Sequence, residues 1–264
     1  MKFSVANDAK PQLKLLITAT IISIALWVIS TFVFSWANYL VYPLQLFATF
    51  VHEGSHVLAA VLTGSHVDSL TVSPDTSGVV WSQPSGWLSQ LLISSAGYLG
   101  TTAFGTLLLV WMRYGYSSKI GLYAASGFVG LMTIVFGLIS PVWYVFSTKA
   151  TLGSVAFTVI SGAVLTAGLF AIAKYASQKW IDFALSFLAV QCLLNAIFSL
   201  KDLFFISTMT DAQTDALNMA NATGLPSIVW VLIWIGISIL MISVGLRIYA
   251  VSQKSTNSEL PFED

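Results

Sequence analysis

Long apolar segments alternate with short polar ones along the chain, and this pattern predicts an all-α bundle of about seven transmembrane helices. An α-helix that crosses the roughly 30 Å hydrocarbon core of a bilayer needs about 20 mostly apolar residues. Segments of this kind span approximately residues 13–37, 44–63, 87–112, 120–139, 151–174, 180–206 and 226–250. Pro43 and Pro226 fit the first turn of the second and seventh helices, and Pro141 is expected to end the fourth. The chain is therefore predicted to be a multi-pass integral membrane protein.

The polar stretch between the second and third segments has a different pattern. It reads HVDSLTVSPDTSGVVWSQPSG, with β-branched residues on both sides of the turn-rich SPDTSG. Such a pattern is typical of a β-hairpin, here over about residues 66–83. A hairpin packed against helices leaves a strand edge that can pair with another chain.

The polar stretch between the sixth and seventh segments predicts a short helix at the membrane interface, over about residues 211–222. Thr210 and Gln213 have the spacing of a capping box, and Gly224 can close the far end. Ala216 and Met219 would then lie on one apolar face of this helix.

The composition of the chain supports a membrane protein and argues against nucleic acid as a partner. The chain is 56% hydrophobic and 8% charged, whereas a soluble domain is roughly a quarter charged. Its formal net charge is zero and no basic cluster occurs, so we expect a lipid bilayer and no nucleic acid as partner. The single cysteine, Cys192, excludes an intrachain disulfide and a cysteine zinc cluster. We expect one transmembrane domain over residues 13–250, between polar tails at 1–12 and 251–264.

The second segment contains the cluster HEGSH, which is unusually polar for a transmembrane helix. His52 and His56 stand four residues apart, so both imidazoles project from one face and can bind one metal ion. Glu53 completes the HExxH arrangement, in which two histidines hold zinc and the glutamate takes a proton from water. The chain has three histidines and three glutamates, so chance gives this arrangement on the order of once in a few thousand such chains. The alternative is a hydrogen-bond network between helices without a metal.

Catalytic zinc normally takes a third protein ligand. Asp202, in the sixth segment, is the preferred candidate, because an odd number of crossings separates it from the histidines and brings it to the same side of the bilayer. Asp202 could instead form an interfacial ion pair with Lys201. The fallback ligands are Asp211, Asp215 and His66.

The lysines and arginines leave the membrane orientation open. With seven crossings they divide into five inside and six outside, which is no bias. If residues 44–63 entered and returned on one face, the division would be nine to two, as the positive-inside rule prefers. We favour seven crossings, because this segment is long enough to span.

The chain resembles the site-2 protease family of intramembrane zinc metallopeptidases, in particular its small bacterial members without an extra soluble domain. The resemblance rests on HEGSH in a transmembrane helix and on the hairpin that follows it. SSAGYLGTTAFG in the next helix is similar to the family's Ala-Gly segment, and NAIFSLKDL takes the place of its Asn…Leu-Asp-Gly motif.

The resemblance implies a role for each matching residue. His52, His56 and Asp202 would bind one zinc ion, Glu53 would be the general base, and Asn195 would help to position the substrate. The hairpin would line up a membrane protein or peptide substrate as an added strand. The expected location is the bacterial cell membrane.

Three classes of function remain at this stage. The preferred one is hydrolysis of peptide bonds within or at the edge of the bilayer. A non-catalytic zinc-binding scaffold or regulatory pseudoprotease would keep the histidines without needing Glu53. A transporter would need polar groups on several helices, but Gln191, Asn195 and Asp202 all lie on one.

Overall fold

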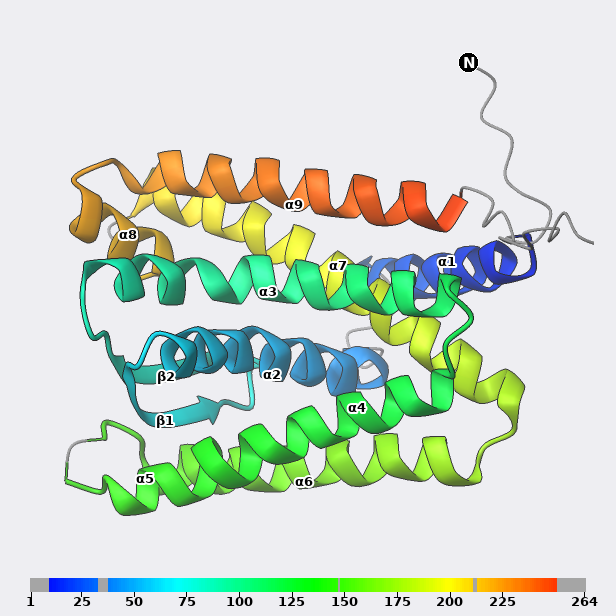
Figure 1. Cartoon of the computed structure of the whole chain (residues 1–264), viewed down its shortest axis with the longest axis horizontal. Helices are drawn as coiled ribbons and strands as arrows, with labels where there is room; N and C mark the ends of the chain where they lie inside the picture. The colour runs from blue at the N-terminus through cyan, green and yellow to red at the C-terminus, as the bar shows by residue number, and fades with distance from the viewer. Residues whose placement is uncertain (1–9, 33–37, 147, 211–212, 251–264) are drawn as a thin grey trace, which may run out of the picture.

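The helices of this chain lie side by side in a bundle, with a two-stranded sheet at one end (Figure 1). The structure is a computed structural model, and it describes residues 10–32, 38–146, 148–210 and 213–250. The elements are α1 (Lys10–Phe32), α2 (Asn38–Leu62), β1 (His66–Val72), β2 (Gly78–Gln83), α3 (Trp87–Arg113), α4 (Ser118–Leu131), the π-helix η3 (Met132–Ile139), α5 (Ser140–Trp143), α6 (Leu152–Tyr175), α7 (Gln178–Met209), α8 (Asp215–Thr223) and α9 (Ser227–Ala250). The predicted all-α membrane bundle with a small hairpin is confirmed.

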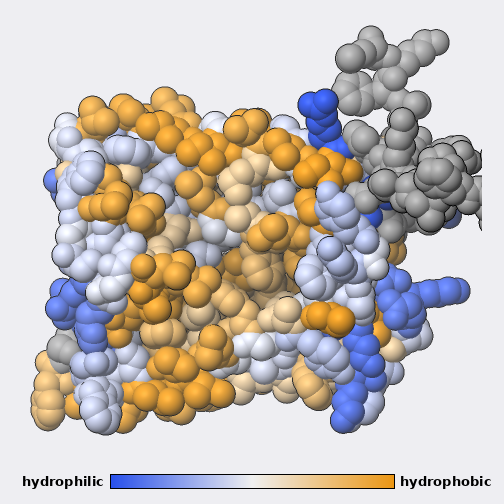
Figure 2. All heavy atoms as spheres, viewed as in Figure 1, coloured by the Kyte–Doolittle hydropathy of each residue, from blue (hydrophilic) through white to orange (hydrophobic). Residues whose placement is uncertain are grey.

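Within the described residues, five stretches of helix are long and apolar enough to cross a membrane: α3, α4 continued through η3 and α5, α6, α7 and α9. A shorter apolar stretch, Leu13–Ile29, lies in α1. Apolar side chains cover much of the face seen in Figure 2, and hydrophilic ones gather toward its two ends. This distribution suits a protein whose sides contact lipid, and the chain is an integral multi-pass membrane protein. The polar tails predicted at residues 1–12 and 251–264 lie mostly outside the described residues.

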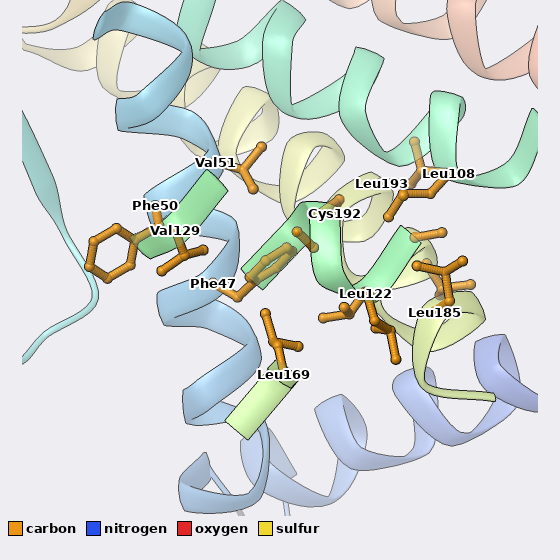
Figure 3. Close-up of a cluster of buried hydrophobic side chains, with 14 of the residues drawn as sticks. Phe47, Phe50, Val51, Leu108, Leu122, Val129, Leu169, Leu185, Cys192 and Leu193 are labelled. Carbon is orange, nitrogen blue, oxygen red and sulfur yellow. The ribbon is translucent and has the colours of Figure 1, made fainter. Parts of the chain in front are cut away.

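Helix α2 lies in the interior of the bundle. Its side chains Phe47, Phe50 and Val51 are buried in the largest apolar cluster, which Figure 3 shows together with the buried Cys192. It is one continuous helix of 25 residues, but it is not among the stretches of the described chain that are apolar enough to count as candidate membrane spans. The prediction that Pro43 lies in the first turn is wrong, because α2 begins at Asn38 and Pro43 lies in its second turn.

The fourth predicted segment does not end at Pro141. The chain continues from α4 through the π-helix η3 into α5, and Pro141 lies in the first turn of α5. Proline lacks an amide hydrogen and its ring crowds the preceding turn, so an irregular turn directly before it is expected in a continuous helix. The wider π turns place Ser140 beside the sheet, where its hydroxyl donates a hydrogen bond to the carbonyl oxygen of Val67 at 2.7 Å. The irregular part of this helix is therefore joined to strand β1 by a hydrogen bond.

The hairpin forms where it was predicted and runs back along α2. Its strands pair antiparallel from His66 opposite Gln83 to Val72 opposite Gly78. Strand β1 is buried against the helices, and β2 is more exposed. Two hydrogen bonds from α2 hold the turn: Tyr42 donates to the carbonyl of Pro74 at 2.7 Å, and Thr49 donates to the carbonyl of Thr76 at 2.7 Å.

Helix α8 is short and packs between the ends of α3 and α9 (Figure 1). Its N-cap is Thr214, whose hydroxyl accepts a hydrogen bond from the amide of Leu217, so the predicted capping box at Thr210 and Gln213 is wrong. Gly224 ends the helix in the left-handed conformation, with φ 74°, as predicted. The apolar face is buried as expected, with Ala216 and Met219 facing the bundle. The first residue of α8 is Asp215.

Candidate active site

The two histidines of HEGSH lie on one face of α2, one helical turn apart, and line a single cavity. The Nδ1 of His56 lies 2.6 Å from the carbonyl oxygen of Ile93 on α3, to which it can only donate. This hydrogen bond fixes the ring so that its other nitrogen, Nε2, faces the cavity, as in many metal-binding histidines. His52 packs edge-on against the ring of Tyr98, with 4.7 Å between the ring centroids.

Asp215, at the start of α8, completes the cluster. Its Oδ2 lies 3.3 Å from Nε2 of His56 and 3.8 Å from Nε2 of His52. Burial alone would raise the pKa of the Asp215 carboxyl. The charge interactions with His56 and His52 outweigh that effect and hold the pKa well below its usual range. Asp215 is therefore a carboxylate, the form that binds a metal.

These three side chains fit a zinc ion. Among the described residues, they are the one group of His, Cys, Asp or Glu whose ligand atoms all lie within 4.8 Å of one another. Two imidazole nitrogens and a carboxylate form a donor set known for catalytic zinc, with a position left for water. Gly97 of α3 leaves the necessary room, because a Cβ atom there would overlap Nε2 of both His52 and His56.

Glu53 is buried beside the histidines, with 6% of its surface exposed. The backbone of Gly78, the first residue of β2, closes over it. A Cβ atom at Gly78 would lie about 2.6 Å from the carboxylate oxygen Oε1 of Glu53. The sheet therefore covers the glutamate directly, and only glycine fits at this point of β2.

Two cavities meet at these side chains. The first, which we call the histidine cavity, has a volume of about 630 Å³ and reaches from the histidines along β2 to α8. The second, the α7 cavity, has a volume of about 460 Å³ and reaches toward α1 and α7. It is lined by polar groups that include Gln45, Thr49, Asn195 and Ser199. The two cavities therefore extend from the histidines in two directions.

The structure brings Asp215, and not Asp202, to the histidines. Asp202 lines the α7 cavity, and its carboxylate forms an ion pair of 2.8 Å with Lys201, the alternative that the sequence left open. Its side chain is 63% exposed. Asp202 thus lies on the expected side of the bundle, but the direction of its side chain differs from the prediction.

The other candidates lie as follows. Asn195 lines the α7 cavity and accepts a hydrogen bond from Ser199 at 3.4 Å. His66 lies at the start of β1 and pairs with Asp68 at 3.1 Å, away from the metal group. Asp211 lies outside the described residues.

The family is decided by a match between residues 19–245 and the family model described as Peptidase M50B-like. The chain belongs to this family, the site-2 protease family. The matched range contains the histidines, Glu53, Asp215 and Asp202. Comparisons with curated proteins and with solved structures give no significant match. M50 peptidases are zinc-dependent, which agrees with the donor set found here.

Proposed function

We propose that this M50B-like peptidase is an intramembrane zinc metalloprotease that hydrolyses peptide bonds of membrane-embedded substrates. One observation carries the proposal: His52, His56 and Asp215 converge on one point of a cavity inside a membrane bundle, with Glu53 beside them. The proposed ligands are these three residues, with Asp215 in place of the Asp202 expected from sequence.

The chemistry divides between the ion and the chain. When bound, zinc acts as a Lewis acid that polarises the scissile carbonyl and makes water acidic near neutral pH. Glu53 takes the proton from the attacking water and delivers it to the leaving amine as the carbon–nitrogen bond breaks. Its burial suits this role, because a carboxylate shielded from bulk water exchanges its proton with the substrate and not with solvent.

The proposed substrate is a membrane protein or peptide that unwinds at the site. A helix in lipid has its backbone groups bonded internally, so cleavage needs local unwinding, and the freed groups need new partners. The edge of β2 along the histidine cavity can supply them by pairing with an extended segment. In the other direction, the amides of Gln45 and Asn195 in the α7 cavity can bond to the unwound backbone.

Cleavage by matched glutamate variants tests the proposal. The probe is a set of synthetic transmembrane peptides of about 20 apolar residues, each interrupted by Asn-Gly and flanked by a fluorophore and a quencher. Full-length protein in lipid nanodiscs should cleave at least one peptide and bind about one zinc per chain. Glu53→Gln should keep the zinc and lose cleavage, because only the proton acceptor is removed. Glu259→Gln, the same change near the C-terminus, is the control.

Two outcomes contradict this function. Cleavage by Glu53→Gln at the wild-type rate excludes the glutamate as base. A wild-type protein that binds zinc and cuts none of the peptides favours the non-catalytic scaffold instead.

A further inference from the structure

Four residues line both cavities: His52, Glu53, Gly78 and Tyr98. A peptide that runs from one cavity into the other must pass these four. Two of them have proposed roles as zinc ligand and base, and Gly78 leaves room for the base. Tyr98, on α3, has no role so far.

The ring of Tyr98 is held on two sides. It meets the His52 ring at an interplanar angle of 89° and stacks on Trp234 of α9 with 5.4 Å between centroids. Trp234 is itself fixed, being 1% exposed and donating its indole N–H to Ser95 at 3.1 Å. The contacts of the Tyr98 ring with His52 and Trp234 therefore orient the phenol before any substrate arrives.

The hydroxyl of Tyr98 is a free donor. Within the described part of the chain it forms no hydrogen bond, and it is not one of the buried polar atoms that lack a partner. The hydroxyl therefore keeps some accessible surface, and Tyr98 lines both cavities. The other neutral donors differ, because Gln90 and Asn218 line only the histidine cavity and Asn195 only the α7 cavity.

We propose that Tyr98 is a further catalytic residue, whose hydroxyl donates a hydrogen bond to the oxygen of the scissile carbonyl. This inference rests on the proposed function. When water adds to the carbonyl carbon, Glu53 takes its proton and the carbonyl oxygen gains negative charge. Tyr98 stabilises that charge without giving up its own proton. The oxygen then re-forms the carbonyl, the carbon–nitrogen bond breaks, and the amine receives the proton from Glu53.

The energetic reason is preorganisation. A donor that its neighbours hold in place before the substrate arrives needs little rearrangement in the transition state, and in a site shielded from water its hydrogen bond is strong. Loss of one such donor lowers kcat by about 10²-fold to 10³-fold. The ground-state carbonyl carries less charge, so substrate binding should change little.

The test is Tyr98→Phe, which keeps the ring contacts with His52 and Trp234 and removes only the hydroxyl. With the best-cleaved transmembrane peptide, kcat should fall about 10²-fold, while KM and zinc content stay at wild-type values. A second readout is equilibrium binding of a phosphinic peptide, whose tetrahedral anion resembles the charged transition state. Its affinity should fall by the same factor as kcat/KM. Tyr123→Phe, on α4, is the matched control and should behave as wild type.

Each other outcome overturns the inference. Wild-type kcat and wild-type phosphinate affinity in Tyr98→Phe would exclude the hydroxyl and leave the proposed function intact. Loss of zinc or of folding in Tyr98→Phe would assign the residue to packing against His52. A wild-type protein that cleaves nothing, with Glu53→Gln identical to it, would overturn the proposed function and this inference together.

Discussion

Asp202 and Asp215 lie on neighbouring elements of the same end of the bundle, yet their environments differ. Asp202 belongs to a long regular helix, α7, and its carboxylate is exposed and paired with the adjacent Lys201. Asp215 opens the short helix α8, and its carboxylate faces His52 and His56. Depth in the membrane is therefore insufficient to select a ligand. Which aspartate can bind the metal depends on the direction in which its helix points the side chain.

The two carboxylates can be removed one at a time. The difference in zinc binding between the two variants should be the largest effect of all the tests. Asp215→Asn should weaken zinc binding by more than about 10²-fold, because loss of a direct ligand should exceed the 10-fold to 100-fold effect of losing an outer-shell partner. Asp202→Asn should keep about one zinc per chain. The measurement is metal content after dialysis against graded chelator, with His56→Ala as the positive control. Zinc retained in Asp215→Asn and lost in Asp202→Asn would reverse the assignment.

The sequence predicts much of this end of the molecule for clear physical reasons. The i, i+4 spacing of His52 and His56 places them on one face of any helix. The apolar segments match the observed helices to within several residues, because length and apolarity define a span. The hairpin follows from its turn residues. The parity of the crossings brings Asp202 to the correct side of the bundle.

Other parts of the site depend on tertiary packing. Asp215 was one of three fallback ligands, since its place depends on how α8 folds back against α3. The indole of Trp87 at the start of α3 donates to the carbonyl of Ala222 at 2.8 Å and holds α8 there. Gly78 gave no local signal, and Gly97 gave only that of a small residue for close helix packing, because the side chains that require glycine at each position are distant in sequence. Pro141 misled because the π-helix η3 leads directly into α5, which continues past this proline.

The second test concerns the room that α3 leaves for the metal group. A methyl group at Gly97 would overlap both imidazoles, so Gly97→Ala should move one ring and weaken zinc binding by about 10-fold to 100-fold, in the range of outer-shell changes. Gly127→Ala is the matched control, because a Cβ atom there has no neighbour within 4 Å. Zinc titration and thermal unfolding of both variants separate the local effect from general destabilisation. Wild-type zinc affinity in Gly97→Ala would show that the histidines do not need this space.

The third test has the smallest expected effect. It asks whether the cap at the start of α8 helps to orient the side chain of Asp215. Thr214 caps the helix at the residue before the ligand, and its loss should cost about 1 kcal/mol of helix stability. If that cost passes to the metal site, Thr214→Ala should weaken zinc binding by about fivefold. Thr151→Ala removes the same kind of cap from α6, which contributes no side chain to the metal group. Equal zinc affinities in the two variants would mean that packing on α3 alone holds Asp215, whereas a loss confined to Thr214→Ala would show that the short helix itself aims the ligand.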